Sequence, residues 1–266
     1  MEYQAKTNWQ LNEFVQPEDM NRIESGIRDV DLNKADSNLS NVLDATFLNK
    51  AKASGIEMPS SADITYYVSP NGNDTTGDGT GDRPFKTLQK AVDSFPYSNP
   101  LGSIYYIRVM PGTYDGFVLR SNKNIWISAD SDNVYIGRIL LYTGFVHIQN
   151  NLTLNDCVSI FNTANLIVQQ VTIDRTSGSG EPAIICQYGG RLIVTDKISI
   201  NNVHVGVDCL FADVFISHMV MTGGVTGISC NCGQVTLGKE EISAATKYVV
   251  TNSGRIYVDS QTIVQQ

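Results

Sequence analysis

Short runs of the form apolar, polar, apolar recur through the second half of the chain. The first run of each repeat begins at Ile125, Val146, Leu166, Leu192, Val214, Val235 and Ile256, so successive repeats start 21, 20, 26, 22, 21 and 21 residues apart. Most repeats add a second run three to five residues later and a weaker third one. Alternation with a period of two predicts β-strands. Three short strands without a helix in about 21 residues predict one coil of a parallel β-solenoid.

The stretch GRLIVTDKISINN, residues 190–202, shows how one coil is built. Its two alternating runs are separated by three residues only, 195–197. This gap is too short for a helix and lacks the Asn-Gly or Asp-Gly turn of a hairpin. We therefore expect a corner between two faces of one coil. The 26-residue interval contains RTSGSGEP at 175–182, which we expect to be a loop extruded from another corner.

Three polar residues directly follow the second strand of their coil: Asn155, Asp174 and Asn201. Stacked at one corner, such side chains satisfy each other's hydrogen bonds from coil to coil. We predict a structural corner ladder rather than a catalytic role for Asp174.

An amphipathic helix is predicted just before the solenoid. Pro84 suits a first helical turn, and the apolar residues that follow it at helical spacing are Phe85, Leu88, Ala91, Val92 and Phe95. Such a helix would cover the open apolar end of the first coil. The phrases YVSPNGNDTTGDGT, RPFKTLQKA and IRVMPGTYDG, within 66–116, resemble the start of right-handed parallel β-helix domains of the pectate-lyase-like superfamily, especially those of phage tail spikes and fibres.

The segment NGNDTTGDGTGD, from residue 71, offers Asp74, Asp78 and Asp82 as possible calcium ligands. It does not follow an EF-hand, because a loop begun at Asn71 has Thr76 where that motif needs glycine and Asp82 where it needs glutamate. The alternative is a turn region held by side-chain to backbone hydrogen bonds, and we favour it.

The first 60 residues differ from the rest. Pro17 suits a helix start, and Met20, Ile23, Ile27 and Val30 form a short apolar seam with heptad spacing. WQLNEFVQPEDMNRIESGI resembles N-terminal segments of structural tail or fibre proteins of phages and of prophage-derived particles of Gram-positive bacteria. The resemblance implies docking to a particle, for which the candidate residues are Trp9, Leu11 and Phe14. The alternative is a helical hairpin packed on the solenoid.

Together these patterns predict an all-β fold: a right-handed parallel β-helix, three strands and about 21 residues per coil, with an N-terminal capping helix and a small α-helical N-terminal segment. We expect a particle-attachment segment with a short helix at 1–35, a helical shaft or linker at 36–63, the β-helix entry and capping helix at 64–103, and the β-helix at 104–266.

Composition narrows the partners. The net charge of −8 argues against nucleic acid and against an anionic membrane surface, both of which need clustered Lys and Arg. No apolar run approaches 18 residues, and the first six residues do not resemble a signal peptide. Five cysteines without CxxC spacing suit free thiols in a reducing compartment. We expect assembly in a bacterial cytoplasm and a final place on a virion or phage-tail-like particle, with no cofactor and no metal.

Catalysis is not indicated. His147, His204 and His218 fall on different coils and faces, which does not favour a metal cluster or a Ser-His-Asp arrangement. Glycoside hydrolysis needs two carboxylates across a groove, and nothing in the sequence pairs any two of the candidates, which are Asp196, Asp208, Asp213 and Glu181. Strand centres also lack the Arg and Lys that a polysaccharide lyase would show.

Two functions remain open. The first is a non-enzymatic fibre or appendage protein whose β-helix binds a cell-surface glycan or supports another receptor-binding part. The second is a tail-spike-type depolymerase acting as a hydrolase or lyase. We favour binding, because the chain lacks long insertions to shape a deep groove. Exposed aromatic rings stack on sugars, and the candidates near corners are Tyr135, Tyr142 and Tyr188.

The middle residue of the first strand in each coil, which we call the first-strand centre, predicts an oligomer. If the residues flanking each centre point inward, alternation turns the centres outward. These centres are Trp126, His147, Ile167, Ile193, Phe215, Thr236 and Tyr257, and five of the seven are large and apolar or aromatic. Their second-strand equivalents, Thr153, Thr172 and Ser199, are polar. A face apolar on both sides is normally buried on both sides, so we expect a parallel homotrimer with these faces and the N-terminal seam at its axis. Cover by residues 1–60 is the alternative.

Overall fold

The computed structural model describes residues 63–96, 103–129, 131–149, 152–175, 180–259 and the backbone of 261–263. The chain divides into two units between Met58 and Pro59, and the described residues belong to the second. The predicted particle-attachment segment and nearly all of the predicted shaft therefore lie outside the described residues. So do the candidate docking and seam residues, which are Trp9, Leu11, Phe14, Met20, Ile23, Ile27 and Val30.

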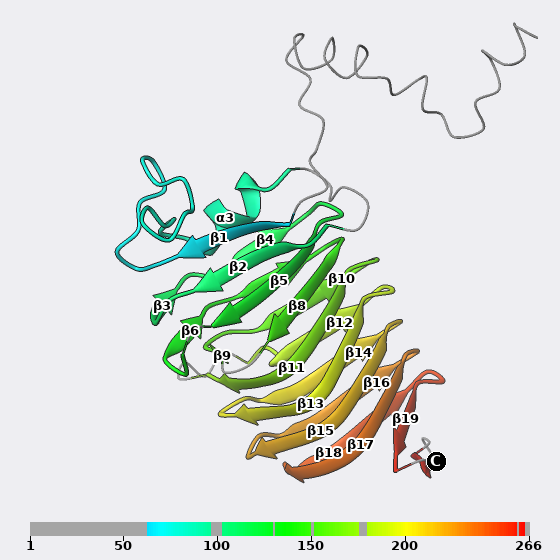
Figure 1. Ribbon diagram of the computed structural model, residues 1–266. Coiled ribbons are helices and arrows are strands. Elements are labelled where there is room, and N and C mark those ends of the chain that lie inside the picture. The colour runs from blue at the N-terminus through cyan, green and yellow to red at the C-terminus, as the bar shows by residue number, and fades with distance from the viewer. Residues whose placement is uncertain are drawn as a thin grey trace, which may run out of the picture. The chain divides into compact units, whose positions relative to one another are not determined.

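The described chain is a parallel β-solenoid with a repeat of about 21 residues, as the sequence predicts (Figure 1). The first face stacks β1 (Ile64–Val68), β2 (Tyr105–Val109), β5 (Asn124–Ala129), β8 (Phe145–Gln149), the first halves of β11 (Asn165–Asp174), β13 (Arg191–Asn201), β15 (Asp213–Thr222) and β17 (Gln234–Ser243), and β19 (Arg255–Val258). The second face stacks β3 (Gly112–Tyr114), β6 (Val134–Ile136), β9 (Leu152–Leu154) and the second halves of the four long strands. The third face stacks β4 (Phe117–Leu119), β7 (Ile139–Leu141), β10 (Val158–Phe161), β12 (Ile184–Gln187), β14 (Val205–Leu210), β16 (Thr226–Asn231) and β18 (Thr246–Thr251). A last strand, β20 (Gln261–Ile263), runs antiparallel to β19.

Inward and outward residues alternate as predicted. Ile125, Ile127, Leu192 and Val194 are fully buried, and they belong to one continuous core that runs the length of the described coils. The residue between each such pair points outward and is half-buried or exposed. The period of two in the sequence is therefore the physical division between core and surface.

The predicted corner at 195–197 is a bend inside a continuous strand. β13 runs without a break from Arg191 to Asn201, and its register with β15 shifts between Val194 and Lys197. The shift places one more residue on β13 than on its neighbours, which is a β-bulge. Backbone hydrogen bonds to the adjacent coils continue on both sides of the bend, and for this reason the strand does not end there.

The predicted capping helix is shorter than its apolar stripe. The helix α3 spans Leu88–Ser94, with Thr87 as its N-cap accepting from the backbone N–H of Lys90. Phe85 is extended instead and bridges Val68. The apolar side chains of the stripe are nonetheless all buried, and Phe95 stacks on Tyr105 with ring centroids 4.5 Å apart. The helix therefore covers the first coil.

In the described ranges no helix is long and apolar enough to cross a membrane.

Side chains from outside the sheet complete this end of the solenoid. β4 is the outermost strand of the third face, with β7 on one side. On the other side the Gln89 side chain of α3 accepts from the Val118 N–H at 2.8 Å and donates to the Val118 carbonyl at 3.2 Å. One amide thus makes the two hydrogen bonds that a neighbouring strand would make. Buried Lys123 donates to the Val92 carbonyl at the end of α3, at 2.7 Å.

Gln89→Leu is expected to lower the free energy of unfolding by about 1 to 3 kcal/mol, because it leaves the Val118 N–H and carbonyl of β4 without partners. Urea denaturation followed by circular dichroism measures the change. Gln169→Leu, at an exposed position of β11, is the control. Equal midpoints for the two variants would contradict this role of Gln89.

Candidate functional site

The corner between the third and the first face carries exposed aromatic side chains. The residue directly after the third-face strand has a left-handed backbone in five coils, with φ of 53° at Asn162, 53° at Tyr188, 50° at Phe211, 53° at Cys232 and 48° at Asn252. Such angles are uncommon for residues other than glycine. They turn the chain sharply, and the side chain at the turn faces solvent: Tyr188 is 59% exposed and Phe211 is 55% exposed.

A row of polar side chains runs beside these aromatic residues. Each is the first residue of a first-face strand and stands in register with the next, in the order Arg191, Asp213, Gln234 and Arg255. All four are exposed. We call this row the polar ladder.

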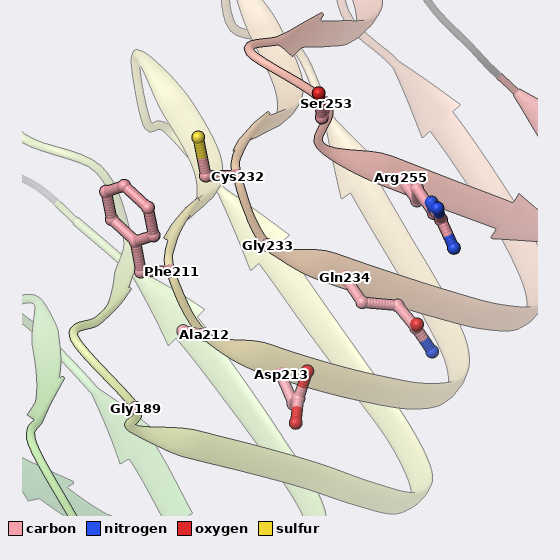
Figure 2. A pocket seen from close by; sticks show the side chains of 9 residues that line it. All are labelled: Gly189, Phe211, Ala212, Asp213, Cys232, Gly233, Gln234, Ser253 and Arg255. Carbon is pink, nitrogen blue, oxygen red and sulfur yellow. The ribbon is translucent and has the colours of Figure 1, made fainter.

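An open depression lies between the corner turns and the polar ladder (Figure 2). We call it the corner groove, and its volume is about 410 Å³. Figure 2 shows Asp213, Gln234 and Arg255 on successive strands along one wall, with Phe211 and Cys232 on the turns above them. The other lining residues are Gly189, Ala212, Gly233 and Ser253. The groove therefore combines an exposed aromatic ring with hydrogen-bond donors and acceptors of both charges.

A second aromatic pair lies on the same corner in earlier coils. The rings of Tyr142 and Phe161 are stacked with centroids 5.3 Å apart, and the Arg120 guanidinium lies 4.8 Å from the Tyr142 centroid. The register of β7 with β10 brings these two residues to the same place in adjacent coils. Aromatic and cationic side chains thus follow the corner through most of the described solenoid.

The structure brings two of the three glycan candidates to this corner. Tyr142 and Tyr188 both follow third-face strands, whereas Tyr135 lies on the second face, in register between Thr113 and Thr153. Sequence reasoning missed Phe211 and the polar ladder. Both were detectable, because Phe211 directly follows an alternating run and the ladder residues directly precede one.

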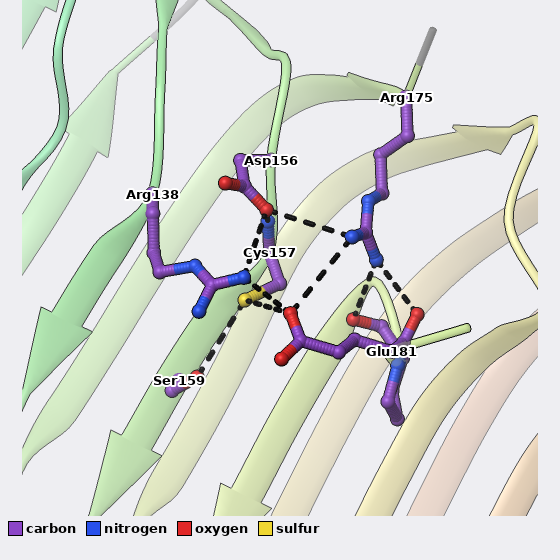
Figure 3. Close-up of polar contacts among 7 residues, drawn as sticks. Arg138, Asp156, Cys157, Ser159, Arg175 and Glu181 are labelled. Carbon is purple, nitrogen blue, oxygen red and sulfur yellow. Dashed lines mark hydrogen bonds and ion pairs between the residues drawn. The ribbon is translucent and has the colours of Figure 1, made fainter. Parts of the chain in front are cut away.

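A polar cluster holds the base of the predicted extruded loop (Figure 3). Arg175, at the start of the loop, is 3% exposed and donates to the Glu181 carbonyl at 2.7 Å. Asp156 lies between two guanidinium groups, 3.4 Å from Arg138 and 3.6 Å from Arg175. The Glu181 carboxylate also bonds Arg138, so both ends of the loop are tied to the body of the solenoid. We call this the loop clamp.

The loop clamp is built for ion pairing rather than for acid catalysis or metal binding. Burial alone would raise the pKa of Asp156, but the Cys157 backbone N–H and the two arginines outweigh it and hold the pKa below its ordinary value. Asp156, Cys157 and Glu181 offer donor atoms within 4.8 Å of one another. However, Arg138 and Arg175 already neutralise the carboxylates, and burial raises the pKa of the Cys157 thiol. A general acid would need a raised carboxyl pKa instead.

The other candidate acids and histidines do not gather. Asp196 is exposed at the bulge of β13, Asp208 accepts from the Gln187 amide at 3.4 Å on the third face, and Asp213 stands in the corner groove. His147 packs against Trp126 with ring centroids 4.3 Å apart, on the first face. The remaining two histidines are His204, which is exposed, and His218, which lies 3.3 Å from Glu241 on the second face.

The predicted corner ladder is in place in part. Asp174 and Asn201 stand in register on adjacent strands. The side-chain hydrogen bond to Asp174 comes, however, from the next residue, Asn202, at 2.7 Å. Asn155 is attached through its backbone N–H to the Ile136 carbonyl of the preceding coil. These contacts are structural ones between coils.

The calcium candidates hold local structure. The Asp74 carboxylate accepts from the backbone N–H groups of Lys86 and Thr87 and from the Thr87 hydroxyl, which fixes the start of α3. Asp78 accepts from Thr80 and pairs with Arg83 at 3.1 Å. Asp82 is exposed. In Asp74 and Asp78 the carboxylates thus serve as turn and helix-start acceptors, which is the alternative that the sequence favours.

Asp156→Asn is expected to destabilise the fold at pH 7, with a difference from wild type that shrinks as the pH falls below the ordinary value of 3.8. A carboxyl whose pKa is lowered by folding stabilises the fold above that value, and the contribution is lost as the pH falls through its folded-state pKa. Urea midpoints at several pH values measure this. Asp115→Asn, at an exposed position, is the control, and a difference independent of pH would count against the loop clamp.

Comparison of the chain with models of known families, with curated proteins and with solved structures gave no match.

Proposed function

We propose that this chain is a structural fibre or appendage protein of a phage or phage-tail-like particle, attached by its N-terminal segment and binding a host-surface glycan through the solenoid. The resemblance of residues 66–116 and of the N-terminal segment to phage fibre and tail-spike proteins supports the particle. The observation that carries glycan binding is the exposed Phe211 ring in the corner groove beside three members of the polar ladder, which are Asp213, Gln234 and Arg255.

The groove has the chemistry that sugars need. A sugar ring offers apolar C–H faces to an aromatic side chain and hydroxyl groups to side chains that donate and accept. Phe211 supplies the first, and Asp213, Gln234 and Arg255 supply the second. An open depression suits a chain that passes along the protein rather than a small ligand enclosed within it.

A depolymerase is the weaker candidate. Hydrolysis of a glycosidic bond needs two carboxylates roughly 5 to 10 Å apart across the substrate. Asp213 is the one carboxylate among the residues that line the corner groove. Incubation with host envelope material distinguishes the two functions: new reducing ends or unsaturated uronates would reject the binding proposal, and retention without cleavage is the expected result.

The outward centres of the first face support the proposed homotrimer. They stand in register as one continuous row through the adjacent strands, from Trp126 to Tyr257. Phe215 in this row is 46% exposed, and Trp126, Ile167 and Ile193 are half-buried. Full burial of an exposed side chain of this size contributes roughly 1.5 to 3 kcal/mol, and each of these partly exposed side chains would contribute a part of that on trimer formation. The corner groove lies at the edge of this face, beside the proposed interface.

Phe211→Asn is expected to leave the fold stable and to weaken glycan binding about tenfold, because the ring contributes a stacking contact and asparagine accepts a left-handed backbone. Binding to a glycan array and urea denaturation measure the two effects. The matched control is Tyr135→Thr on the second face, which should bind as wild type does. Loss of binding in the control and not in Phe211→Asn would move the site to the second face.

The double variant Ile193→Asp with Phe215→Asp is expected to be monomeric where the wild type is trimeric, since it places charge in the proposed interface. Multi-angle light scattering on the full chain gives the mass. Ser199→Asp with Val220→Asp, on the second face of the same two strands, should remain trimeric. A monomeric wild type, or a folded trimer of the Ile193 and Phe215 variant, would reject the interface.

A further inference from the structure

We propose that the polar ladder selects an acidic, extended polysaccharide whose carboxylates are spaced apart along the chain, and that Arg191 and Arg255 bind two of them. The inference rests on the proposed function of the corner groove and adds to it the chemical class of the glycan. It also gives the direction in which the glycan runs, which is along the stack of coils.

The two arginines are spaced to meet separate sugars of one chain. The ladder provides one side chain per coil, and adjacent strands lie about 4.8 Å apart. Arg191 and Arg255 are separated by three such steps, through Asp213 and Gln234, or about 14 Å along the solenoid. An extended pyranose chain advances, per sugar, by about the spacing between two adjacent coils. A glycan along the ladder therefore meets about one side chain per sugar, with an arginine at the first and the fourth.

The two guanidinium groups have no acidic partner among the described residues. Arg83, Arg138 and Arg175 each lie within 4.0 Å of a carboxylate. Among the described residues, no carboxylate lies that close to Arg191 or Arg255, although Asp213 is the neighbour of Arg191 in the ladder. Both arginines are exposed. A free guanidinium presents two parallel N–H donors that match a carboxylate, so each is ready to bind one from a ligand.

The two residues between the arginines disfavour a carboxylate on every sugar. Asp213 repels a ligand carboxylate at the second position, and Gln234 is neutral at the third. The order of charges along the ladder is positive, negative, neutral, positive. An acid on every sugar would place one against Asp213, whereas an acid on every third sugar meets an arginine each time. The ladder therefore favours spaced carboxylates over a continuous polyuronate.

Because the whole chain is negatively charged, it can attract an acidic glycan only through contacts at short range. The chain carries a net charge of −8, which repels a polyanion at long range. Attraction must therefore come from the arginines at contact distance. This predicts that binding by wild type weakens as salt screens the two contacts, and that added salt no longer weakens binding when both arginines are removed, because only repulsion then remains to be screened.

The test is an array of linear glycans of equal length. They carry a uronate on every sugar, on every second sugar, on every third sugar or on none. Each acidic glycan is also printed in its carboxyl-reduced form as a neutral control. Wild type should retain the third-sugar glycan most strongly and lose about tenfold or more on carboxyl reduction. Arg191→Gln and Arg255→Gln should each lose a similar factor. Arg108→Gln, on β2 of the same face, is the matched control and should bind as wild type does.

Asp213→Asn provides an independent readout. Removing the negative charge at the second position should raise retention of the glycan with a uronate on every sugar relative to retention of its carboxyl-reduced form. Equal retention of acidic and carboxyl-reduced glycans by wild type would overturn this inference and leave the proposed function standing. Retention of no glycan at all by wild type would overturn both.

Discussion

Backbone hydrogen bonds between parallel coils hold each residue directly beside its equivalent in the next coil, and the other features of the protein depend on this register. Inside, it stacks apolar side chains such as Ile125, Val146 and Leu166 into a continuous core. Outside, it converts each position of the repeat into a row. The apolar row of the first face and the polar ladder at its edge are therefore consequences of the same constraint. A surface of this kind changes its chemistry from residue to residue along each strand and repeats the same position from strand to strand along the stack.

The same constraint creates the problems that the irregular parts solve. A stack of coils has unpaired backbone groups at its ends, and Gln89 of α3 makes two of the missing bonds on β4. An insertion into a coil pulls residues out of register. The loop clamp meets this problem, because Arg175 and Glu181 at the two ends of the loop are joined to Arg138 and Asp156 of earlier coils. In both places a polar side chain replaces contacts that regular stacking would otherwise supply.

The proposed functions use neighbouring rows without competing for them. The apolar centres of the first face suit burial against other copies of the chain. The left-handed turns direct Tyr188 and Phe211 away from that face, toward the corner. A glycan on the corner and a partner chain on the first face would thus lie side by side. Each row of side chains repeats along the stack of coils. A linear polymer bound along a row repeats along the same axis, and it is therefore a suitable ligand.

The sequence by itself determined the repeat length, the inward and outward positions and the apolar row, because period-two alternation at a fixed interval leaves one way to bury the apolar side chains. It also indicated a lid, because Leu88, Ala91 and Val92 share a helical face. Only the tertiary structure decided where the lid begins, since Asp74 reaches Thr87 across a turn and fixes the helix start there. It alone joined Arg138 to Glu181, 43 residues apart, and turned Phe211 outward. These features depend on corner dihedrals and on contacts between positions that are not equivalent in the repeat, and a period cannot specify either.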